Sequence, residues 1–257
     1  MRILLTGASG QLGHKITNYL QNNGIKVTTL GRKPINSRTL NYSWSLGMSP
    51  NPQAFVGIDC ALHLAWSTTD RGDYDFHLNV GGSRKIFEAA DSSRVRIVNF
   101  SSLSAVYPMS SYGKAKKTVE DANVSGLNLR IAKLEEPYFK SDLHPAKNIL
   151  RKIVFIPIPR GLSIQVIELD QLLSELIKHI QETSVPSIYT LSYERYELRE
   201  YIKKYHGMSS FYVPKRVVSA FFICCKSSRT RYGNLLHDRW VSLASTDQAL
   251  CQQVKSF

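Results

Sequence analysis

Short apolar runs alternate with segments of helical periodicity through the first half of the chain. The apolar runs have the length of buried strands and lie at residues 2–6, 25–30, 61–65, 96–100 and 127–134. Segments in which apolar side chains recur every three or four positions, as on one face of a helix, lie between them at residues 14–22, 78–90 and 112–122. This alternation predicts βαβ units, and hence an α/β fold with a doubly wound parallel sheet.

The pattern is weaker elsewhere. Residues 37–53 are polar and predict no regular element, and prolines interrupt the chain after residue 135. Helical periodicity returns at residues 169–181 and 197–205, around a further predicted strand at residues 187–191. We therefore expect residues 135–257 to complete the sheet and to form a small C-terminal lobe.

The composition fits one large α/β domain. The 257 residues are 43% hydrophobic and 21% charged, which is enough apolar material for a full core. The longest strongly apolar stretch, residues 217–225, is about half of the roughly 20 residues that span a bilayer, so we expect neither a membrane span nor a signal peptide. The four cysteines lack the spacing of a disulfide framework or a zinc site, which indicates a reducing cytoplasm.

The formal net charge of +13 raises the question of a nucleic-acid or membrane-surface partner. Lysine and arginine are scattered, however, with no run of five like charges and no recognisable nucleic-acid motif. We therefore expect no nucleic-acid partner, and we attribute the charge to a solvated surface that also attracts an anionic small substrate.

A glycine-rich turn follows the first predicted strand and opens the first helix. The motif is Gly7-Ala-Ser-Gly10-Gln-Leu-Gly13, whose glycines would let a pyrophosphate sit against backbone N–H groups and the helix dipole. Its spacing resembles that of the extended and atypical short-chain dehydrogenases/reductases, the epimerase/dehydratase group. The resemblance implies a Rossmann-like fold with an NAD(P)-binding core at residues 1–134. The cofactor contacts expected from this turn are Gly7, Ser9, Gly10, Gln11, Leu12 and Gly13.

The end of the second predicted strand bears on the choice of dinucleotide. An NAD site usually places an acidic residue there, on the ribose 2′-hydroxyl, whereas this chain has Arg32 and Lys33. A guanidinium can clamp a 2′-phosphate and stack on adenine, so NADP is the preferred cofactor and NAD the alternative. A solvated basic turn is the structural explanation that competes with this assignment.

The segment from Asp59 to Ala65 resembles the family's third cofactor-contacting segment. The resemblance assigns Asp59 to the adenine amino group and Ala65 to the nicotinamide ribose. Between them, His63 is expected to be a buried, hydrogen-bonded core histidine rather than a catalytic one. Asn79 resembles the helix asparagine that supports the active site, with an ordinary helix cap as the alternative.

The sequence Tyr112-Gly-Lys-Ala-Lys116 carries the predicted chemistry. A spacing of four on a helix puts the phenol and the ammonium on one face. A nearby cation favours the phenolate, which lets Tyr112 exchange a proton with a substrate hydroxyl while a hydride moves to or from nicotinamide. Lys116 would also hold the ribose hydroxyls of the cofactor.

The serine that completes such a site departs from the family pattern. Leu103 stands where the extended enzymes usually have serine or threonine. We expect Ser102 to bind the substrate oxygen, with Ser101 and Ser104 as alternatives. The interval from Ser102 to Tyr112 is short for the family, which predicts a compressed active-site loop.

The resemblance further implies that the C-terminal lobe selects the substrate, often a nucleotide sugar whose diphosphate is met by arginines. Arg229 and Arg231 are the candidates, and solvated loop residues are the alternative. The sequence thus predicts an NAD(P)-dependent oxidoreductase or epimerase of a nucleotide sugar, with a homodimer as a compatible assembly. The alternative is a non-catalytic NADP-binding regulator or interaction module, which Leu103 favours and the Tyr112–Lys116 pair disfavours.

Overall fold

A parallel sheet of seven strands forms the centre of the molecule. The computed structural model describes residues 1–67, 73–108, 110–135, 155–159, 163–181, 187–192, 194–206 and 209–213. The strands, in chain order, are β1 (Arg2–Thr6), β2 (Lys26–Gly31), β3 (Leu40–Ser43), β4 (Cys60–His63), β5 (Arg96–Ser102), β6 (Leu127–Ile131) and β10 (Ile188–Leu191). Their order in the sheet is β10-β6-β5-β4-β1-β2-β3, and every neighbouring pair is parallel. This is the expected Rossmann-like, doubly wound sheet.

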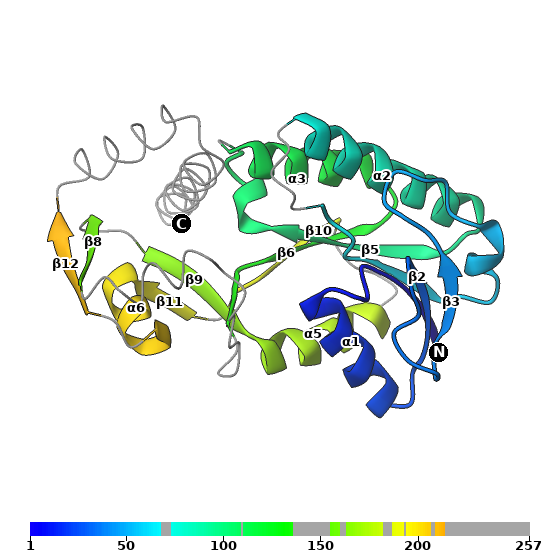
Figure 1. Cartoon of the computed structure of the whole chain (residues 1–257), viewed down its shortest axis with the longest axis horizontal. Coiled ribbons are helices and arrows are strands. Elements are labelled where there is room, and N and C mark those ends of the chain that lie inside the picture. Colours follow the sequence, from blue (N-terminus) through cyan, green and yellow to red (C-terminus); the bar gives the residue numbers. More distant parts are fainter. Residues whose placement is uncertain are drawn as a thin grey trace.

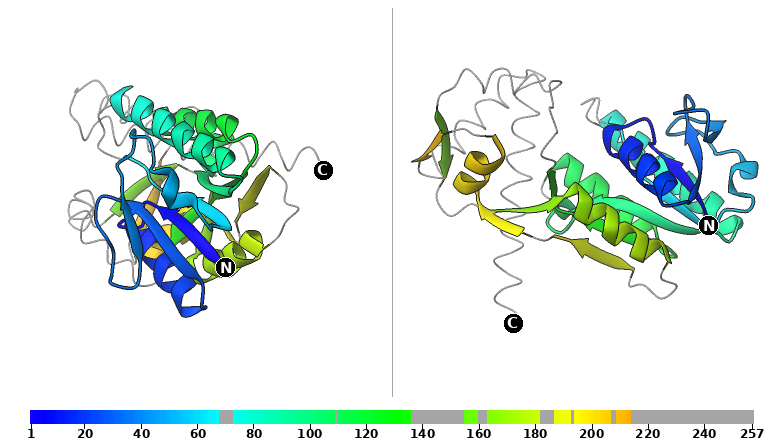
Figure 2. Two further views of the ribbon diagram at one scale, coloured as in Figure 1. Left: turned by 90° about the vertical axis from the view of Figure 1, so that its right-hand side faces the viewer. Right: turned by 90° about the horizontal axis from the view of Figure 1, so that it is seen from below.

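Two layers of helices cover the sheet. Helices α1 (Gln11–Asn22) and α5 (Leu169–Gln181) lie on one face, and α2 (Asp73–Ser92) and α3 (Ser111–Ala122) lie on the other (Figures 1 and 2). Parallel neighbours require a crossover connection, which is why the chain passes over a face between successive central strands. Single 3₁₀ turns, η1 (Pro52–Phe55) and η2 (Leu103–Ala105), precede β4 and follow β5.

The core consists of two apolar clusters, one on each face of the sheet. Neighbouring residues of a strand point to opposite faces, so Leu5 packs in the cluster that contains Ile16 of α1, whereas Leu4 packs in the cluster that contains Ile86 of α2. All four side chains are fully buried. Burial on both faces explains why the central strands have nearly continuous apolar sequences.

A second group of elements lies beside the sheet, on the side toward which the parallel strands run (Figure 1). It contains β7 (Lys133–Glu135), β9 (Ser163–Glu168) and β11 (Glu194–Glu197), in the order β11-β9-β7. Strand β8 (Phe155–Pro159) pairs with β12 (Ser209–Val213), and helix α6 (Leu198–His206) lies between β11 and β12 in the chain. Residues 214–257 lie outside the described part of the chain.

The predicted strands and helices are confirmed for most of the described chain, and two expectations are wrong. Residues 37–53 were expected to be irregular, but Leu40–Ser43 form the edge strand β3. An edge strand is hydrogen-bonded to one neighbour only and is half-exposed, so it can form without an apolar sequence. The strand expected at residues 127–134 is divided, because β6 pairs with β5 and β10 whereas β7 pairs with β9. Alternation of apolar residues cannot reveal where a chain leaves one sheet for another.

Within the described residues, no helix combines the length and the apolar character needed to cross a membrane. The same part of the chain contains no group of three or more His, Cys, Asp or Glu side chains placed to hold a metal ion.

Two adjacent glycines in α2 meet different surroundings. The loop at residues 44–48 is tied to the helix, since Lys85 Nζ donates to the Gly47 carbonyl at 2.6 Å. A Cβ at Gly82 would lie 2.6 Å from Leu46 Cδ1 and 2.7 Å from the Gly47 backbone nitrogen, whereas a Cβ at Gly81 would meet nothing within 4 Å. Gly82 therefore allows the loop to approach, and Gly81 has no such role.

We predict opposite effects of alanine at these two positions. Gly81→Ala should raise the free energy of unfolding by about 0.5–1 kcal/mol, because alanine is the better helix former. Gly82→Ala should lower it by about 1–3 kcal/mol, because the loop backbone must move to admit the methyl group. Urea unfolding of the two variants and the wild type measures both, and equal effects would contradict the close approach.

Candidate cofactor and active site

The glycine turn after β1 is packed against the chain that follows β4. Gly7 has a φ of +72°, and its carbonyl accepts a hydrogen bond from the Gly10 amide at 3.0 Å. A Cβ on Gly7 would lie 2.7 Å from the Ala65 amide nitrogen, and a Cβ on Gly13 would lie 2.3 Å from the Gly7 carbonyl oxygen. Both positions therefore need glycine, one for its backbone conformation and one for the close packing of helix on turn.

The start of α1 suits an anionic group. Gly10 caps the helix without a side-chain hydrogen bond, and no acidic residue lies in the first turn. Ser9, Gly10 and Gln11 are exposed, and Leu12 is half-buried. Backbone N–H groups at a helix start carry partial positive charge and are the usual ligands of a dinucleotide pyrophosphate, so these residues fit the group that the glycine motif implies.

Thr6 fixes the geometry where β1 and β4 end side by side. Its Oγ1 accepts hydrogen bonds from the amides of Leu64 and Ala65, both at 3.2 Å, and lies 2.8 Å from His63 Nδ1. The other ring nitrogen of His63 is 2.9 Å from Ser83 Oγ. Burial, followed by the nearby Lys116 charge, lowers the pKa of His63 to about 3. The expectation that His63 is a buried, hydrogen-bonded core residue is confirmed.

The basic pair expected to select the dinucleotide lies at the same edge of the sheet. Leu30 of β2 is in register with Thr6 of β1, and Arg32 and Lys33 follow two and three residues later. Both side chains are exposed. No acidic residue that could bind a ribose 2′-hydroxyl lies at the carboxyl end of β2 or at the two positions after it.

Asp59 lies at the opposite edge of the sheet. It precedes β4, and its carboxylate accepts a hydrogen bond from the Arg2 amide at 2.7 Å, at the start of β1. Because β1 and β4 are parallel, both strands start at one end of the sheet and finish at the other. The length of β4 therefore separates Asp59 from Ala65 and the glycine turn. The assignment of Asp59 to the adenine is therefore wrong, whereas Ala65 does lie against the turn.

Asn79 holds the segment that follows β4 from the other side. Its Oδ1 accepts from the Ser67 amide at 2.7 Å, and its Nδ2 donates to the Ser67 carbonyl at 3.1 Å. Asn79 is buried in the interior of α2, so it is no helix cap. The side chain supports the loop that carries Ala65 and Trp66.

The side chains of Tyr112 and Lys116 lie together with Trp66 at the start of α3. The Lys116 ammonium donates to the Phe100 carbonyl of β5 at 2.7 Å and lies 3.7 Å from the centre of the Trp66 ring. It is 5.9 Å from the centre of the Tyr112 ring, which itself meets the Trp66 ring edge-on at 5.8 Å. Gly113 permits this arrangement, since a Cβ there would lie 2.5 Å from the Ser104 carbonyl. Trp66 was not expected from the sequence.

The environment changes the acidity of both candidate catalytic groups. Burial lowers the pKa of Lys116 from 10.5 to about 7, although the negative charge of Glu120 opposes the shift. Desolvation of its hydroxyl raises the pKa of Tyr112 above 10.0, although the residue as a whole is 38% exposed and the nearby Ser102 opposes the shift. In the free protein Tyr112 is therefore a neutral phenol near neutral pH, which is the form that donates a proton.

The three serines at the end of β5 have different partners. Ser102 is half-buried, lies close enough to Tyr112 to oppose the rise in its pKa, and caps η2 by accepting from the Ser104 amide at 3.3 Å. Ser101 is buried and donates to Glu120 at 2.6 Å. Ser104 is buried in η2, 3.4 Å from Ser102 Oγ. Leu103 is also buried, so of these residues Ser102 is the one brought to the phenol.

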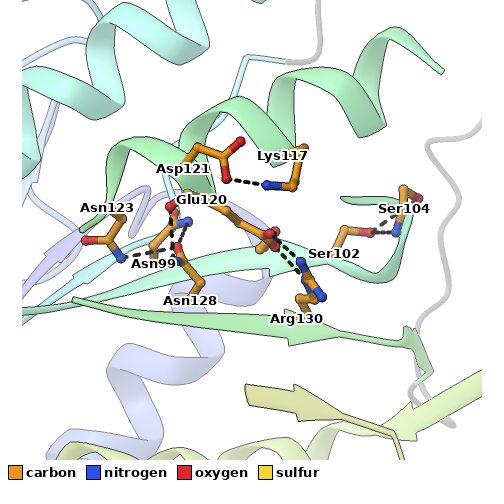
Figure 3. Close-up of polar contacts among 10 residues, drawn as sticks. Asn99, Ser102, Ser104, Lys117, Glu120, Asp121, Asn123, Asn128 and Arg130 are labelled. Carbon is orange, nitrogen blue, oxygen red and sulfur yellow. Dashed lines mark hydrogen bonds and ion pairs between the residues drawn. The ribbon is translucent and has the colours of Figure 1, made fainter. Parts of the chain in front are cut away.

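A buried ion pair lies one helical turn beyond Lys116. Glu120 is 4% exposed, and its two carboxylate oxygens accept from Arg130 Nε at 2.9 Å and Arg130 Nη2 at 2.7 Å (Figure 3). Its carbonyl accepts from Asn128, which also joins Asn99 and Asn123. Removing one partner of such a pair typically costs about 3–5 kcal/mol. No local pattern predicted this network, although the position of Glu120 four residues after Lys116 is visible in the sequence.

Two further features are not part of the described site. Arg229 and Arg231 lie outside the described residues. A surface hollow of about 400 Å³ is lined by residues of the second half of α1 and the loop after β2: Asn18, Gln21, Asn22, Asn36, Ser37 and Arg38. It belongs to the far end of α1 from the glycine turn and brings together no residue of the site.

Comparisons with known proteins agree with this geometry. Residues 3–128 match the model of the NAD dependent epimerase/dehydratase family. Among solved structures, MoeE5 in complex with UDP-glucuronic acid and NAD has 18% identity and a TM-score of 0.67, with 83% of this chain and 86% of that chain covered. The Bordetella bronchiseptica enzyme WbmG in complex with NAD and UDP has 19% identity and a TM-score of 0.66, with 83% and 81% covered.

A third solved structure, UDP-N-acetylglucosamine 4-epimerase from Bacillus cereus, has 16% identity and a TM-score of 0.64, with 84% of this chain and 91% of that chain covered. A comparison with curated proteins finds no relative that matches the sequence. The matched residues contain the glycine turn and both candidate catalytic side chains. The part of the chain that carries the site is therefore similar to the NAD dependent epimerase/dehydratase family.

Proposed function

We propose that this protein is an NADP-preferring oxidoreductase or epimerase that acts on a nucleotide sugar. The observation that carries the proposal is the meeting of Tyr112, Lys116 and Ser102 at the carboxyl edge of the sheet, next to the segment on which the glycine turn rests. A proton-transfer group and a dinucleotide-binding turn at one edge are what a hydride-transfer enzyme needs.

The choice of substrate class rests on two further observations. Solved structures with the same fold are in complex with UDP-glucuronic acid or UDP, and a third is an epimerase of UDP-N-acetylglucosamine. The chain itself carries a formal charge of +13, which favours the approach of a nucleotide sugar with its negatively charged diphosphate. The C-terminal residues 135–257 are proposed to select it.

The proposed roles follow from the contacts of each side chain. A bound nicotinamide dinucleotide supplies or accepts the hydride. Tyr112, a neutral phenol in the free protein, gives its proton to the oxygen of a keto sugar as that carbonyl is reduced, and takes the proton back when the alcohol is oxidised. Ser102, which lies near Tyr112, orients the same oxygen. Lys116 holds the ribose hydroxyls and stabilises the phenolate that is left.

The preference for NADP rests on Arg32 and Lys33. Both are exposed at the edge where the adenosine end of a dinucleotide would lie, beyond the strand next to β1. A guanidinium binds a phosphate through two parallel hydrogen bonds, and Lys33 adds a second positive charge. NAD remains the alternative cofactor.

We predict that NADPH binds at least about ten times more tightly than NADH, which corresponds to about 1.4 kcal/mol. Arg32→Ala should weaken NADPH and leave NADH nearly unchanged, because only NADPH carries the 2′-phosphate. Fluorescence titration with both dinucleotides measures this, and Arg38→Ala, another exposed arginine of the loop after β2, is the control. Equal affinities in the wild type would contradict the NADP assignment.

The protein should take up protons when it binds a dinucleotide at about pH 8. With a pKa of about 7, Lys116 is mostly neutral in the free protein at that pH. The phosphates of the ligand favour the ammonium and raise the pKa of Lys116, so the affinity should fall as pH rises from 7 toward the raised value. Calorimetry in buffers of different ionisation enthalpy counts the protons. Lys116→Met should abolish the uptake, and an uptake near zero in the wild type would show that Lys116 does not sense the ligand.

Tyr112→Phe separates catalysis from binding. It removes one hydroxyl from a ring that otherwise keeps its contact with Trp66, so NADPH affinity should barely change while turnover falls about 10²-fold or more. The assay follows NADPH oxidation with 4-keto nucleotide sugars and epimerisation of the parent sugars. Lys116→Met should impair both binding and turnover.

The same assay decides between enzyme and regulator. A wild type that binds NADPH but turns over no sugar would favour the non-catalytic regulator, a reading that the buried Leu103 at the family's serine position supports. An active wild type with an equally active Tyr112→Phe would overturn the proposed mechanism.

A further inference from the structure

The indole of Trp66 covers the side of Lys116 that the strand does not. One hydrogen of the ammonium is donated to the Phe100 carbonyl of β5, and the centre of the Trp66 ring lies 3.7 Å from Nζ. Lys116 is 7% exposed as a result. The contact is a cation–π interaction at short range, of the kind that is strongest where the cation is desolvated.

The segment that contains Trp66 contacts both the glycine turn and the ammonium. Ala65 touches the turn, since a Cβ at Gly7 would lie within 2.7 Å of its amide nitrogen, and the next residue touches Lys116. A dinucleotide on the turn whose ribose reached Lys116 would therefore compete with the indole for the ammonium.

The backbone on both sides of Trp66 is held by hydrogen bonds. On one side the Ala65 amide donates to Thr6, and on the other both backbone groups of Ser67 are bonded to Asn79. Trp66 itself is half-buried and lies in a segment without regular secondary structure. Its side chain contacts Lys116, the edge of Tyr112 and the apolar cluster on the α2 face of the sheet. Uncovering Lys116 therefore requires the side chain to turn and to give up these contacts, while the backbone stays in place.

We propose that Trp66 is a cap on Lys116, which shields the ammonium in the free protein and leaves it when a dinucleotide ribose binds. The shielding is independent of the proposed function, whereas the displacement by a dinucleotide rests on it. The cap makes Trp66 a residue that sets cofactor affinity. Because its contact with Lys116 is lost on binding, it lowers that affinity by up to about thirtyfold, the equivalent of a strong cation–π contact.

The shielding is tested on the free protein by acylation of Lys116, followed by mass spectrometry of the α3 peptide between about pH 6 and pH 11. The plateau of the rate at high pH reports access to Nζ, and the midpoint reports its pKa. Trp66→Ala should raise the plateau at least tenfold, since the ring no longer covers Nζ. Lys114, exposed on the same helix, is the internal control and should not change.

Trp66→Leu is the matched variant. It keeps an apolar side chain in place but removes the ring face, so it should also raise the plateau, even if the alanine variant folds poorly. An unchanged plateau in the folded variants would overturn the cap.

Titration with NADPH tests the displacement. Both variants should bind NADPH more tightly than the wild type, by several-fold and up to about thirtyfold, in the same buffer. Weaker binding would show that the indole is part of the bound site and would overturn the displacement. If the labelling responds as expected while neither wild type nor variants bind any dinucleotide, the proposed function fails and the shielding of Lys116 stands.

Discussion

Contact between two backbone segments is the constraint on which the site depends. The turn at Gly7 rests on the amide of Ala65, and Thr6 accepts hydrogen bonds from that amide and its neighbour, so the ends of β1 and β4 are locked side by side. No side chain fits between them. Main-chain packing thus places the glycine turn beside the Trp66 segment. The Trp66 ring in turn contacts Tyr112 at the start of α3. The exposed side chains of the turn remain available for binding.

Protein groups, rather than solvent, stabilise the buried charges near α3. Lys116 loses its hydration on burial, but its ammonium contacts the Phe100 carbonyl and the Trp66 ring and lies near the carboxylate of Glu120. The balance of these effects leaves its pKa close to neutrality. Glu120 in turn is paired with Arg130 and bonded to Ser101. A lysine whose pKa lies near neutrality changes its protonation state when a phosphate-bearing ligand binds. In a water-filled site its pKa would be that of an ordinary lysine, and this response would be lost.

The alternation of apolar and helical segments was enough to derive the architecture of the sheet, because each central strand is buried on both faces and each crossover helix has one apolar face. The edges were harder. Strand β3 has a polar, half-exposed sequence and exists because β2 offers it a ladder of hydrogen bonds. The break between β6 and β7 is invisible in the sequence, since apolar and polar residues alternate in both pieces and only their pairing partners differ.

For the site, the sequence by itself determined the residue types that local spacing brings together: the glycine turn at a helix start, and a phenol and an ammonium one turn apart on α3. Only the tertiary structure decided which distant residues join them. It moved Asp59 to the other edge of the sheet, because a strand separates its two ends by its full length. It also placed Ser102 near Tyr112, whereas Ser101 is bonded to Glu120, and set Trp66 on Lys116, because contacts between separate elements depend on packing, which local patterns do not record.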